Sequence, residues 1–489
     1  MRLEDIAQGN LNVNLATVRS TPILVKQIQQ ILGRLRLYPE GRWIDGIYGS
    51  RTENALRSFT QIVGLPSWPQ NPIDRTLAQR LLQTTPTEFA LSLAKNRQQV
   101  WQDFQNLTVG YDAEMLPILD AGWERSPLAS QISAYPLRLK EKPDYQEVIS
   151  LGATLALNNP TRRANLNPYP AIGLIPEIDS NGLNFLHSDI TEACVAVGSF
   201  VEGEIRCRWL GRAALNNVEC WSSTKFIPIL FVIAQSNSRM ITLDIDNCLI
   251  RDVESSHRFH DFIRGIFTYD NQVASSNSLA GTMKRFATWS AMETWTRQMT
   301  GNNQLQFAGL YGEAPFMDSP QLVDRQTNRV ILSAAPLQPR GNNTLSVYDL
   351  TRLITLLGWH YQIPAGARIP GAQWDSLESL ARAMGQDTAR YLDFAMDKLA
   401  TAPIMGSPVV LSKMGFGRST IRDRTELVYT ALLRFVDRRS KPAKLRTIAM
   451  GLRAAKALGD ENREAREIEA RMATEVTEIL RRCLADELG

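Results

Sequence analysis

The stretch SSTKFIPILFVIAQS, residues 222–236, places a serine and a lysine at the start of an apolar segment. An apolar helix is expected from Thr224 to Ser236. A three-residue step at the start of a helix brings Ser222 and Lys225 onto one face. A serine hydroxyl needs a neighbouring base to become a nucleophile, and a lysine can be that base once burial or a second cation lowers its pKa. On its own the tetrad indicates only an N-cap serine and a solvated lysine, because it recurs by chance in long chains.

Strands are expected on both sides of a helical middle. Residues 193–200 and 205–210 flank a turn signal at Glu202-Gly203, which predicts a β-hairpin. Further strands are predicted at residues 409–413 and 426–436. Helices are predicted at residues 282–300, 347–357 and 460–484. This order predicts an α+β fold, with one antiparallel sheet built from the two chain ends and covered by helices.

Two further motifs follow the serine–lysine tetrad. They are Ser275-x-Asn277 in the middle of the chain and Lys413-x-Gly415 at the end of a predicted strand. Their order, their spacing and the elements that carry them resemble the serine β-lactamase and penicillin-binding-protein family. The resemblance covers about residues 185–489. It implies a β-lactamase-like antiparallel sheet flanked by a helical subdomain, and a reaction through a serine acyl-enzyme.

The resemblance also implies a role for each motif residue. Ser222 would be the acylated nucleophile, and Lys225 would be its general base. Ser275 would relay a proton to the leaving nitrogen, and Asn277 would hydrogen-bond Lys225 and the substrate amide. Lys413 would supply a positive field that holds Lys225 neutral and attracts a substrate carboxylate.

The third motif would complete the site around the substrate carbonyl. Gly415 would let the substrate backbone lie close to the strand, and the backbone N–H groups of Ser222 and Phe416 would form the oxyanion hole. Two departures from the family's pattern bear on the substrate. Met414 stands where the family usually has Thr or Ser, so a hydroxyl that helps to bind a carboxylate is missing. Glu313 lacks the Leu-Asn context of a deacylating glutamate, and a surface-loop residue is the better interpretation.

Residues 21–85 predict a small three-helix unit with a loop-rich middle, and the helices are expected at residues 23–37, 52–62 and 74–82. The glycines of its loop suit a tight turn, and Thr52 suits the start of a helix. The segment resembles the peptidoglycan-binding domain that is attached to cell-wall hydrolases. The resemblance implies glycan binding, although the same module also serves as a structural spacer. The motif residues that carry it are Asp45, Gly46, Tyr48, Gly49 and Thr52.

With 489 residues, the chain has room for roughly three units of about 150 residues. We expect an N-terminal tail at residues 1–20, the peptidoglycan-binding-like domain at 21–85, a proline-punctuated bridge at 86–170 and the serine hydrolase domain at 171–489. The net charge of +4 is too small to indicate a nucleic acid or an anionic membrane as a partner. The longest apolar run is far shorter than the roughly 20 residues of a membrane helix, so no membrane span is expected.

Other candidate groups are weaker. His257 and His260 have near-helical spacing but no third ligand, so solvated histidines are the better interpretation. Asp244 begins an acidic turn that lacks the Gly and Glu of a calcium loop. The five cysteines are too few for a disulfide scaffold, and both a single disulfide and buried free thiols remain open. No metal and no cofactor are expected.

Two functions of different class follow from these observations. The first is a serine acyl-enzyme on cell-wall peptides, either a carboxypeptidase or endopeptidase or a weak β-lactam hydrolase, held at peptidoglycan by residues 21–85. The second is a catalytically silent relative that binds peptidoglycan or a protein partner. No signal peptide is recognised at the N-terminus. A periplasmic or cell-wall location is nevertheless expected, with the export signal absent from this numbering.

Overall fold

A computed structural model describes residues 1–9, 11–108, 122–140, 166–201, 204–336, 341–439 and 443–488. The chain forms two units, which are Met1–Val100 with Met396–Ala402, and Trp101–Ala395 with Pro403–Gly489. Each unit has its own cluster of buried apolar side chains. The smaller unit carries the peptidoglycan-binding-like motif, and the larger unit carries the three motifs of the predicted serine site.

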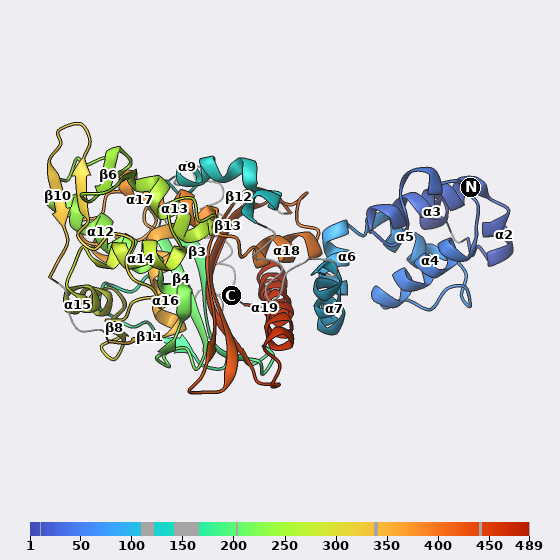
Figure 1. Ribbon diagram of the computed structural model, residues 1–489. Coiled ribbons are helices and arrows are strands. Elements are labelled where there is room, and N and C mark those ends of the chain that lie inside the picture. Colours follow the sequence, from blue (N-terminus) through green and yellow to red (C-terminus); the bar gives the residue numbers. More distant parts are fainter. Residues whose placement is uncertain are drawn as a thin grey trace. The chain divides into compact units, whose positions relative to one another are not determined.

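The larger unit is built on an antiparallel sheet that joins its early and late segments. Within the described residues this sheet has seven strands, in the order β1-β4-β3-β14-β13-β12, with β2 paired to β4. β3 pairs with β14, so segments far apart in the sequence lie side by side (Figure 1). The predicted α+β sheet built from both ends of the domain is therefore confirmed. The strands are β1 (Asn167–Pro168), β2 (Ile178–Asp179), β3 (Ile190–Val201), β4 (Glu204–Arg212), β12 (Met405–Ser419), β13 (Arg424–Asp437) and β14 (Lys444–Lys456).

Helices cover both faces of this sheet. α16 (Val347–Gly358) packs on β3, β13 and β14, and all of its residues are buried. α17 (Trp374–Gly385) packs on β12. α19 (Glu461–Leu484) covers β13 and β14 from the other face (Figure 1). The predicted helices at residues 347–357 and 460–484 are confirmed, and Asp460 is the N-cap of α19.

One predicted helix is in fact two. The expected helix at residues 282–300 is divided into α14 (Ser276–Lys284) and α15 (Trp289–Thr300). Thr288 caps α15, since its Oγ1 accepts a hydrogen bond from the N–H of Ala291 at 3.2 Å. Threonine favours this position over a helix interior. β14 has no counterpart in the sequence-based prediction.

The other described elements are two small sheets and shorter helical segments. Two small sheets have the strand orders β10-β9-β6-β7 and β5-β11-β8. Their strands are β5 (Val218–Glu219), β6 (Cys248–Arg251), β7 (Ser256–Arg258), β8 (Gln306–Phe307), β9 (Gln321–Asp324), β10 (Val330–Ser333) and β11 (Asn343–Leu345). The further α-helices after residue 96 are α7 (Arg97–Thr108), α9 (Tyr135–Lys140), α12 (Phe226–Arg239), α13 (Phe259–Thr268) and α18 (Tyr391–Lys398). The 3₁₀ turns after residue 96 are η2 (Trp123–Arg125), η3 (Ala129–Ala134), η4 (Trp221–Thr224), η5 (Ile245–Asn247) and η6 (Ala365–Ala367).

Part of the expected bridge belongs to the core of the larger unit. Residues 109–121 and 141–165 of the bridge lie outside the described residues. Between these two gaps, α9 packs on α17 and β12, and Tyr135 and Leu139 are fully buried. This segment therefore contributes to the domain core and is not a separate linker.

The smaller unit contains the three predicted helices and more. Residues 1–20, expected as a tail, instead contain two short helices. Leu3, Ile6 and Val18 of this segment are fully buried in the same apolar cluster as the three predicted helices. The helices of the unit are α1 (Leu3–Gln8), α2 (Leu15–Arg19), α3 (Pro22–Arg34), α4 (Ser50–Ile62), α5 (Arg75–Gln83) and α6 (Pro86–Leu93).

A buried glutamine organises the glycine-containing loop of this unit. Gln29 lies on α3, and its Nε2 donates to Asp45 Oδ1 at 3.0 Å, to Ile47 O at 3.1 Å and to Thr52 Oγ1 at 3.2 Å. The N–H of Gly46 donates to Gln29 Oε1 at 2.9 Å. The motif residues Asp45, Gly46 and Thr52 therefore have a structural reason for their identity.

Gln29→Leu is expected to destabilise the smaller unit by about 2–4 kcal/mol, because it leaves several buried polar groups without partners. The measurement is amide hydrogen exchange of residues 22–62 in the full chain, where protection should fall. Gln30→Leu is the matched control, since Gln30 is exposed on the same helix. Equal protection in the two variants would contradict the proposed role of Gln29.

The cysteines form no disulfide with one another in the described residues, and all five are buried. Burial raises the pKa of Cys194 and of Cys207 to about 12. Their thiols therefore stay protonated at neutral pH. Of the helices that the structure describes, none has both the length and the apolar character to cross a bilayer.

Candidate active site

Ser222 lies in the tight turn η4, in front of the apolar helix α12, which begins at Phe226. Trp221 has a left-handed φ of 52°, which is a strained conformation for a bulky residue. Ser223 is buried, and its Oγ donates to Cys220 O at 2.6 Å. Ser222 is half-buried, and its hydroxyl makes no hydrogen bond among the described residues. Ser222 is therefore the serine of this turn that is available to react.

Lys225 is buried, with 1% of its surface exposed. Its Nζ donates to Ser276 Oγ at 3.0 Å and to Asn277 Oδ1 at 2.6 Å. Burial lowers the pKa of Lys225 to about 6, helped by the positive charge of Lys413 and opposed by the carboxylate of Glu313. The amine is therefore largely neutral at pH 7.

A neutral lysine amine has two N–H donors and one lone pair. Ser276 and Asn277 take up the two donors of Lys225. The lone pair remains for the proton of a hydroxyl group. Ser222 stands one turn back along the chain, and its carbonyl accepts from the N–H of Lys225 at 3.2 Å. The pair has the composition of a nucleophile with its base.

Ser276 contacts Lys225, although the motif implies a role, as proton relay to the leaving nitrogen, only for Ser275. Ser276 is buried, and its Oγ donates to Ile266 O at 2.9 Å. Ser275 instead caps α14, where its Oγ accepts from the N–H of Ser278 at 3.1 Å. In this geometry Ser276, and not Ser275, is the serine that touches the candidate base.

Glu313 lies at the site, although the sequence favours a surface-loop residue. Its carboxylate is exposed, yet it accepts from Asn277 Nδ2 at 2.7 Å and from Ser278 Oγ at 3.1 Å. Ser275 Oγ also donates to it. The hydrogen bonds from Ser275 and Asn277 lower the pKa of Glu313. A charged carboxylate therefore holds the amide that contacts Lys225.

Lys413 is fully buried on β12. Its Nζ donates to Tyr269 Oη, to Asp387 Oδ1 at 3.3 Å and to Met414 O at 3.1 Å. Burial opposes its charge, but Tyr269 and Asp387 outweigh burial and raise the pKa of Lys413. Lys413 therefore stays charged and depresses the pKa of Lys225. Neither Tyr269 nor Asp387 belongs to a sequence motif, so only the fold reveals them.

Met414 points away from this site. Side chains alternate between the two faces along a strand. The thioether of Met414 accepts from Tyr391 Oη at 3.8 Å. Tyr391 in turn packs edge-on against Tyr429 on β13, with ring centroids 4.9 Å apart. The side chain at position 414 therefore belongs to the core beneath β12, on the face opposite Lys413.

The backbone of β12 approaches the η4 turn through a glycine. A Cβ on Gly415 would lie 2.6 Å from Cys220 O and Ser223 N, and 2.8 Å from Ser222 N. β12 is an edge strand, so alternate N–H groups along it face away from β13. The predicted oxyanion donors, the N–H groups of Ser222 and Phe416, belong to these two adjoining segments.

Trp221 is held by packing and by an ionic network. A Cβ on Gly417 would lie 2.4 Å from its ring, and its indole N–H donates to Glu426 Oε2 at 3.1 Å. Burial raises the pKa of Glu426, but Arg422 and Arg453 outweigh burial and lower that pKa to about 2. The charged, fully buried carboxylate therefore holds the strained η4 turn in place.

Gly415→Ala is expected to destabilise the larger unit by about 1–3 kcal/mol, since the added methyl group must push η4 and β12 apart. Acylation of Ser222 should fall at least tenfold for the same reason. The measurements are thermal unfolding and the rate of covalent labelling. Gly366→Ala is the matched control, because a Cβ there has no heavy atom within 4 Å. Native-like labelling of Gly415→Ala would show that the close approach does not matter.

The weaker candidates have local partners. A ring nitrogen of His260 lies 3.0 Å from Ser379 Oγ, and the ring of His257 packs edge-on against Phe316. Asp244 accepts from the N–H of the second following residue at 3.1 Å, as in a polar turn. In the part of the chain that the structure describes, no three His, Cys, Asp or Glu side chains are grouped so that they could hold a metal ion.

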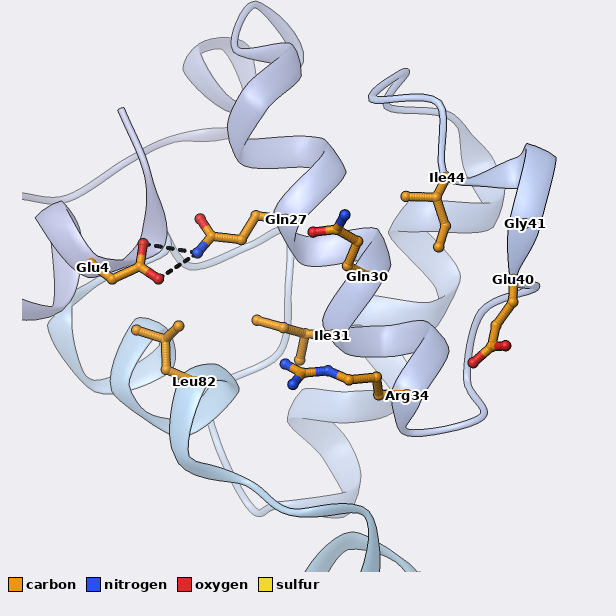
Figure 2. Close-up of a pocket in the computed structure, with 9 residues that line it drawn as sticks. All are labelled: Glu4, Gln27, Gln30, Ile31, Arg34, Glu40, Gly41, Ile44 and Leu82. Carbon is orange, nitrogen blue, oxygen red and sulfur yellow. Dashed lines mark hydrogen bonds between the residues drawn. The ribbon is translucent and has the colours of Figure 1, made fainter.

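The smaller unit has a separate pocket of about 550 Å³ with both polar and apolar lining residues. Figure 2 shows side chains of α3 along its wall, with Glu4 and Gln27 joined by hydrogen bonds of 2.6 and 2.8 Å. Its described lining includes none of the five motif residues. Among those five, Tyr48 accepts from Trp68 Nε1 at 2.5 Å and Gly49 is the N-cap of α4. The lining residues are Glu4, Gln27, Gln30, Ile31, Arg34, Glu40, Gly41, Ile44 and Leu82.

No family model and no curated protein matches the chain. Among solved structures, a β-lactamase from Desulfarculus baarsii aligns at 15% identity and a TM-score of 0.36, over 60% of this chain and 93% of that one. PBP-A aligns at 10% identity and a TM-score of 0.35, over 63% and 99%. A class A β-lactamase from Mycobacterium abscessus aligns at 12% identity and a TM-score of 0.35, over 62% and 98%.

These neighbours are of the β-lactamase and penicillin-binding-protein type that the three motifs resemble. The alignments are too distant to assign chemistry to this chain. On the order of its own strands and motifs, the larger unit has a serine β-lactamase-like α+β fold, as predicted.

Proposed function

We propose that the larger unit is a serine acyl-enzyme that cleaves amide or ester bonds in cell-wall peptides. The observation that carries this proposal is Lys225, which is buried, has a pKa lowered to about 6 and has both amine N–H donors engaged. A neutral amine one turn from the free hydroxyl of Ser222 is what general-base activation of a serine requires.

In the proposed reaction, Ser222 Oγ attacks the substrate carbonyl carbon, and its proton passes to Lys225 Nζ. The bond from that carbon to the leaving nitrogen or oxygen breaks, and the leaving group takes up the proton from Lys225. Water then attacks the acyl-serine ester and gives one proton to Lys225, which returns it to Ser222 Oγ. The N–H groups of Ser222 and Phe416 would stabilise the oxyanion in both steps.

Covalent labelling of the full chain tests this function. The protein is incubated with a fluorescent penicillin and, separately, with the neutral activated ester p-nitrophenyl acetate. Adducts are located by peptide mass spectrometry. An adduct on Ser222 from either probe supports the acyl-enzyme. Absence of a Ser222 adduct with both probes would overturn it.

A second candidate function is a catalytically silent relative that binds peptidoglycan or a protein partner. It is favoured because two site residues already spend their hydrogen bonds within the protein. Lys413 donates to Tyr269 and Asp387, and Asn277 donates to Glu313. This candidate predicts ligand binding with no adduct on Ser222. The labelling experiment therefore separates the two functions.

We further propose that the smaller unit holds the chain to peptidoglycan. Its pocket (Figure 2) offers donors and acceptors for glycan or peptide groups, including Gln30 and Arg34 on α3. The test is cosedimentation of the full chain with purified sacculi, which should fall at least tenfold in a Gln30→Ala/Arg34→Ala variant. Arg80→Ala, exposed and outside the pocket, is the control. Retained binding by the double variant would overturn the pocket, and no binding by the native chain would overturn the anchor.

We propose a periplasmic or cell-wall location, because both proposed activities need peptidoglycan within reach. Cell fractionation with an antibody to the native chain tests this. Recovery of the full chain from the cytosolic fraction alone would contradict the proposed location.

A further inference from the structure

Lys413, the cation expected to attract a substrate carboxylate, has no donor left for one. An ammonium group carries three N–H donors. Those of Lys413 point to Tyr269 Oη, to Asp387 Oδ1 at 3.3 Å and to Met414 O at 3.1 Å. The side chains of Lys413 and Asp387 are both 0% exposed. A carboxylate could bond to Lys413 only by displacing one of these partners.

The charge balance of the site also disfavours an anionic substrate. Lys225 is largely neutral at pH 7, because its pKa is lowered to about 6. Asp387 pairs with Lys413 out of contact with solvent; burial raises the pKa of Asp387, and the charge of Lys413 opposes that rise. Glu313 then adds a negative charge beside Asn277 that no cation within hydrogen-bond distance balances in the described residues. An incoming carboxylate would therefore be repelled by the negative charge of Glu313.

Neither a hydroxyl at position 414 nor a nearby arginine is available to bind a carboxylate. Met414 supplies no hydroxyl and packs against Tyr391 on the opposite face of β12. The guanidinium groups nearest the η4 turn in the hydrogen-bond network are those of Arg422, Arg424 and Arg453, and all three pair with the buried Glu426.

We propose that Ser222 is acylated only by substrates whose leaving group carries no carboxylate. The bond that is cleaved would then be an internal amide or ester bond and not the carboxy-terminal bond of a peptide. This specificity rests on the proposed acyl-enzyme function. Tyr269 and Asp387 determine this specificity, because they occupy N–H donors of Lys413 that could otherwise bind a carboxylate. The covalent chemistry is unchanged: the carbonyl carbon bonds to Ser222 Oγ, and the neutral leaving group departs with the proton held by Lys225.

The test uses two thioesters with the same acyl group, benzoylglycine, on the full chain. One has mercaptoacetate as its leaving group, which carries a free carboxylate, and the other has methyl mercaptoacetate. Thiol release gives kcat/KM for each substrate, and each value is divided by the uncatalysed rate constant of that substrate. We expect the neutral thioester to be preferred at least fivefold.

The possible outcomes distinguish failure of the proposed specificity from failure of the proposed acyl-enzyme function. A preference below fivefold, or a preference for the carboxylate, with turnover that is lost in Ser222→Ala, overturns the specificity and leaves the acyl-enzyme standing. No Ser222-dependent turnover of either thioester overturns the specificity, and it overturns the acyl-enzyme as well when the labelling probes also leave no adduct on Ser222.

Tyr269→Phe tests the hydrogen bond from Lys413 to Tyr269 directly. The variant keeps the ring 4.4 Å from Lys413 Nζ but removes the hydroxyl that accepts from it. One N–H donor of Lys413 is freed, so the preference for the neutral thioester should fall at least threefold, mainly through a lower KM for the carboxylate. Tyr361→Phe is the control, because the hydroxyl of Tyr361 makes no hydrogen bond among the described residues. An unchanged preference in Tyr269→Phe would remove Tyr269 as a determinant.

Discussion

Ser222→Ala is expected to remove the covalent adduct and to lower turnover of activated esters at Ser222 by at least about 10³-fold, because no other hydroxyl of the η4 turn is free to react. The thermal unfolding midpoint should change little, since the hydroxyl of Ser222 makes no hydrogen bond among the described residues. The measurement is intact-protein mass after incubation with each probe, together with a melting curve.

Ser223→Ala is the matched control for this variant. Ser223 is the next residue, but it is fully buried and bonded to Cys220 O at 2.6 Å. Its loss should lower stability modestly and leave the adduct on Ser222 in place. Adduct formation that survives Ser222→Ala and disappears in Ser223→Ala would show that the wrong serine has been assigned.

Lys225→Met is expected to slow acylation of Ser222 by about 10²–10⁴-fold, the usual contribution of a general base. Methionine has a similar volume and no charge, so the buried site should still fold. In the native protein the base is the neutral amine, whose conjugate acid has a pKa lowered to about 6. Acylation should therefore be fastest above pH 6 and fall about tenfold per pH unit below it.

The pH profile distinguishes a base from a merely structural lysine. Lys225→Met should remove the fall below pH 6 together with most of the rate. Glu313→Gln is the matched charge variant, because the Glu313 carboxylate raises the pKa of Lys225. Without that charge, the fall should move to lower pH. A native profile that is flat between pH 5 and pH 7 would contradict Lys225 as the base.

The parts of the fold that could be predicted are those whose signal is local. α16 has apolar residues at helical spacing, and Ser346 caps its start in a capping box with Asp349. The β3–β4 hairpin has two β-prone runs around a turn signal. Within each of the two motifs Ser222-x-x-Lys225 and Ser275-x-Asn277 the spacing is local, so the candidate site residues could be predicted. Their contact across 52 residues was predicted only through the resemblance to the family.

The parts that could not be predicted depend on partners far away in the sequence. β14 lacks a clear apolar alternation because it carries charged residues such as Arg453, which is buried only by pairing with Glu192 and Glu426. Tyr269 and Asp387 become site residues because α13 and the segment after α17 lie beside β12. The assignment of Ser275 over Ser276 differs by a single position, and only the start of α14 decides which hydroxyl faces Lys225.

The pairing of β3 with β14 also dictates when the active site can exist during synthesis. The turn that carries Ser222 leaves the ribosome long before β12 and β14, which supply Lys413 and complete the sheet. At roughly 5–20 residues per second, the interval between Lys225 and Lys413 lasts on the order of 10–40 s. During that time the lysine beside the serine has neither the burial nor the neighbouring cation that lowers its pKa. Under the proposed function, Ser222 is therefore inert in a nascent chain and gains its base only when the fold is complete.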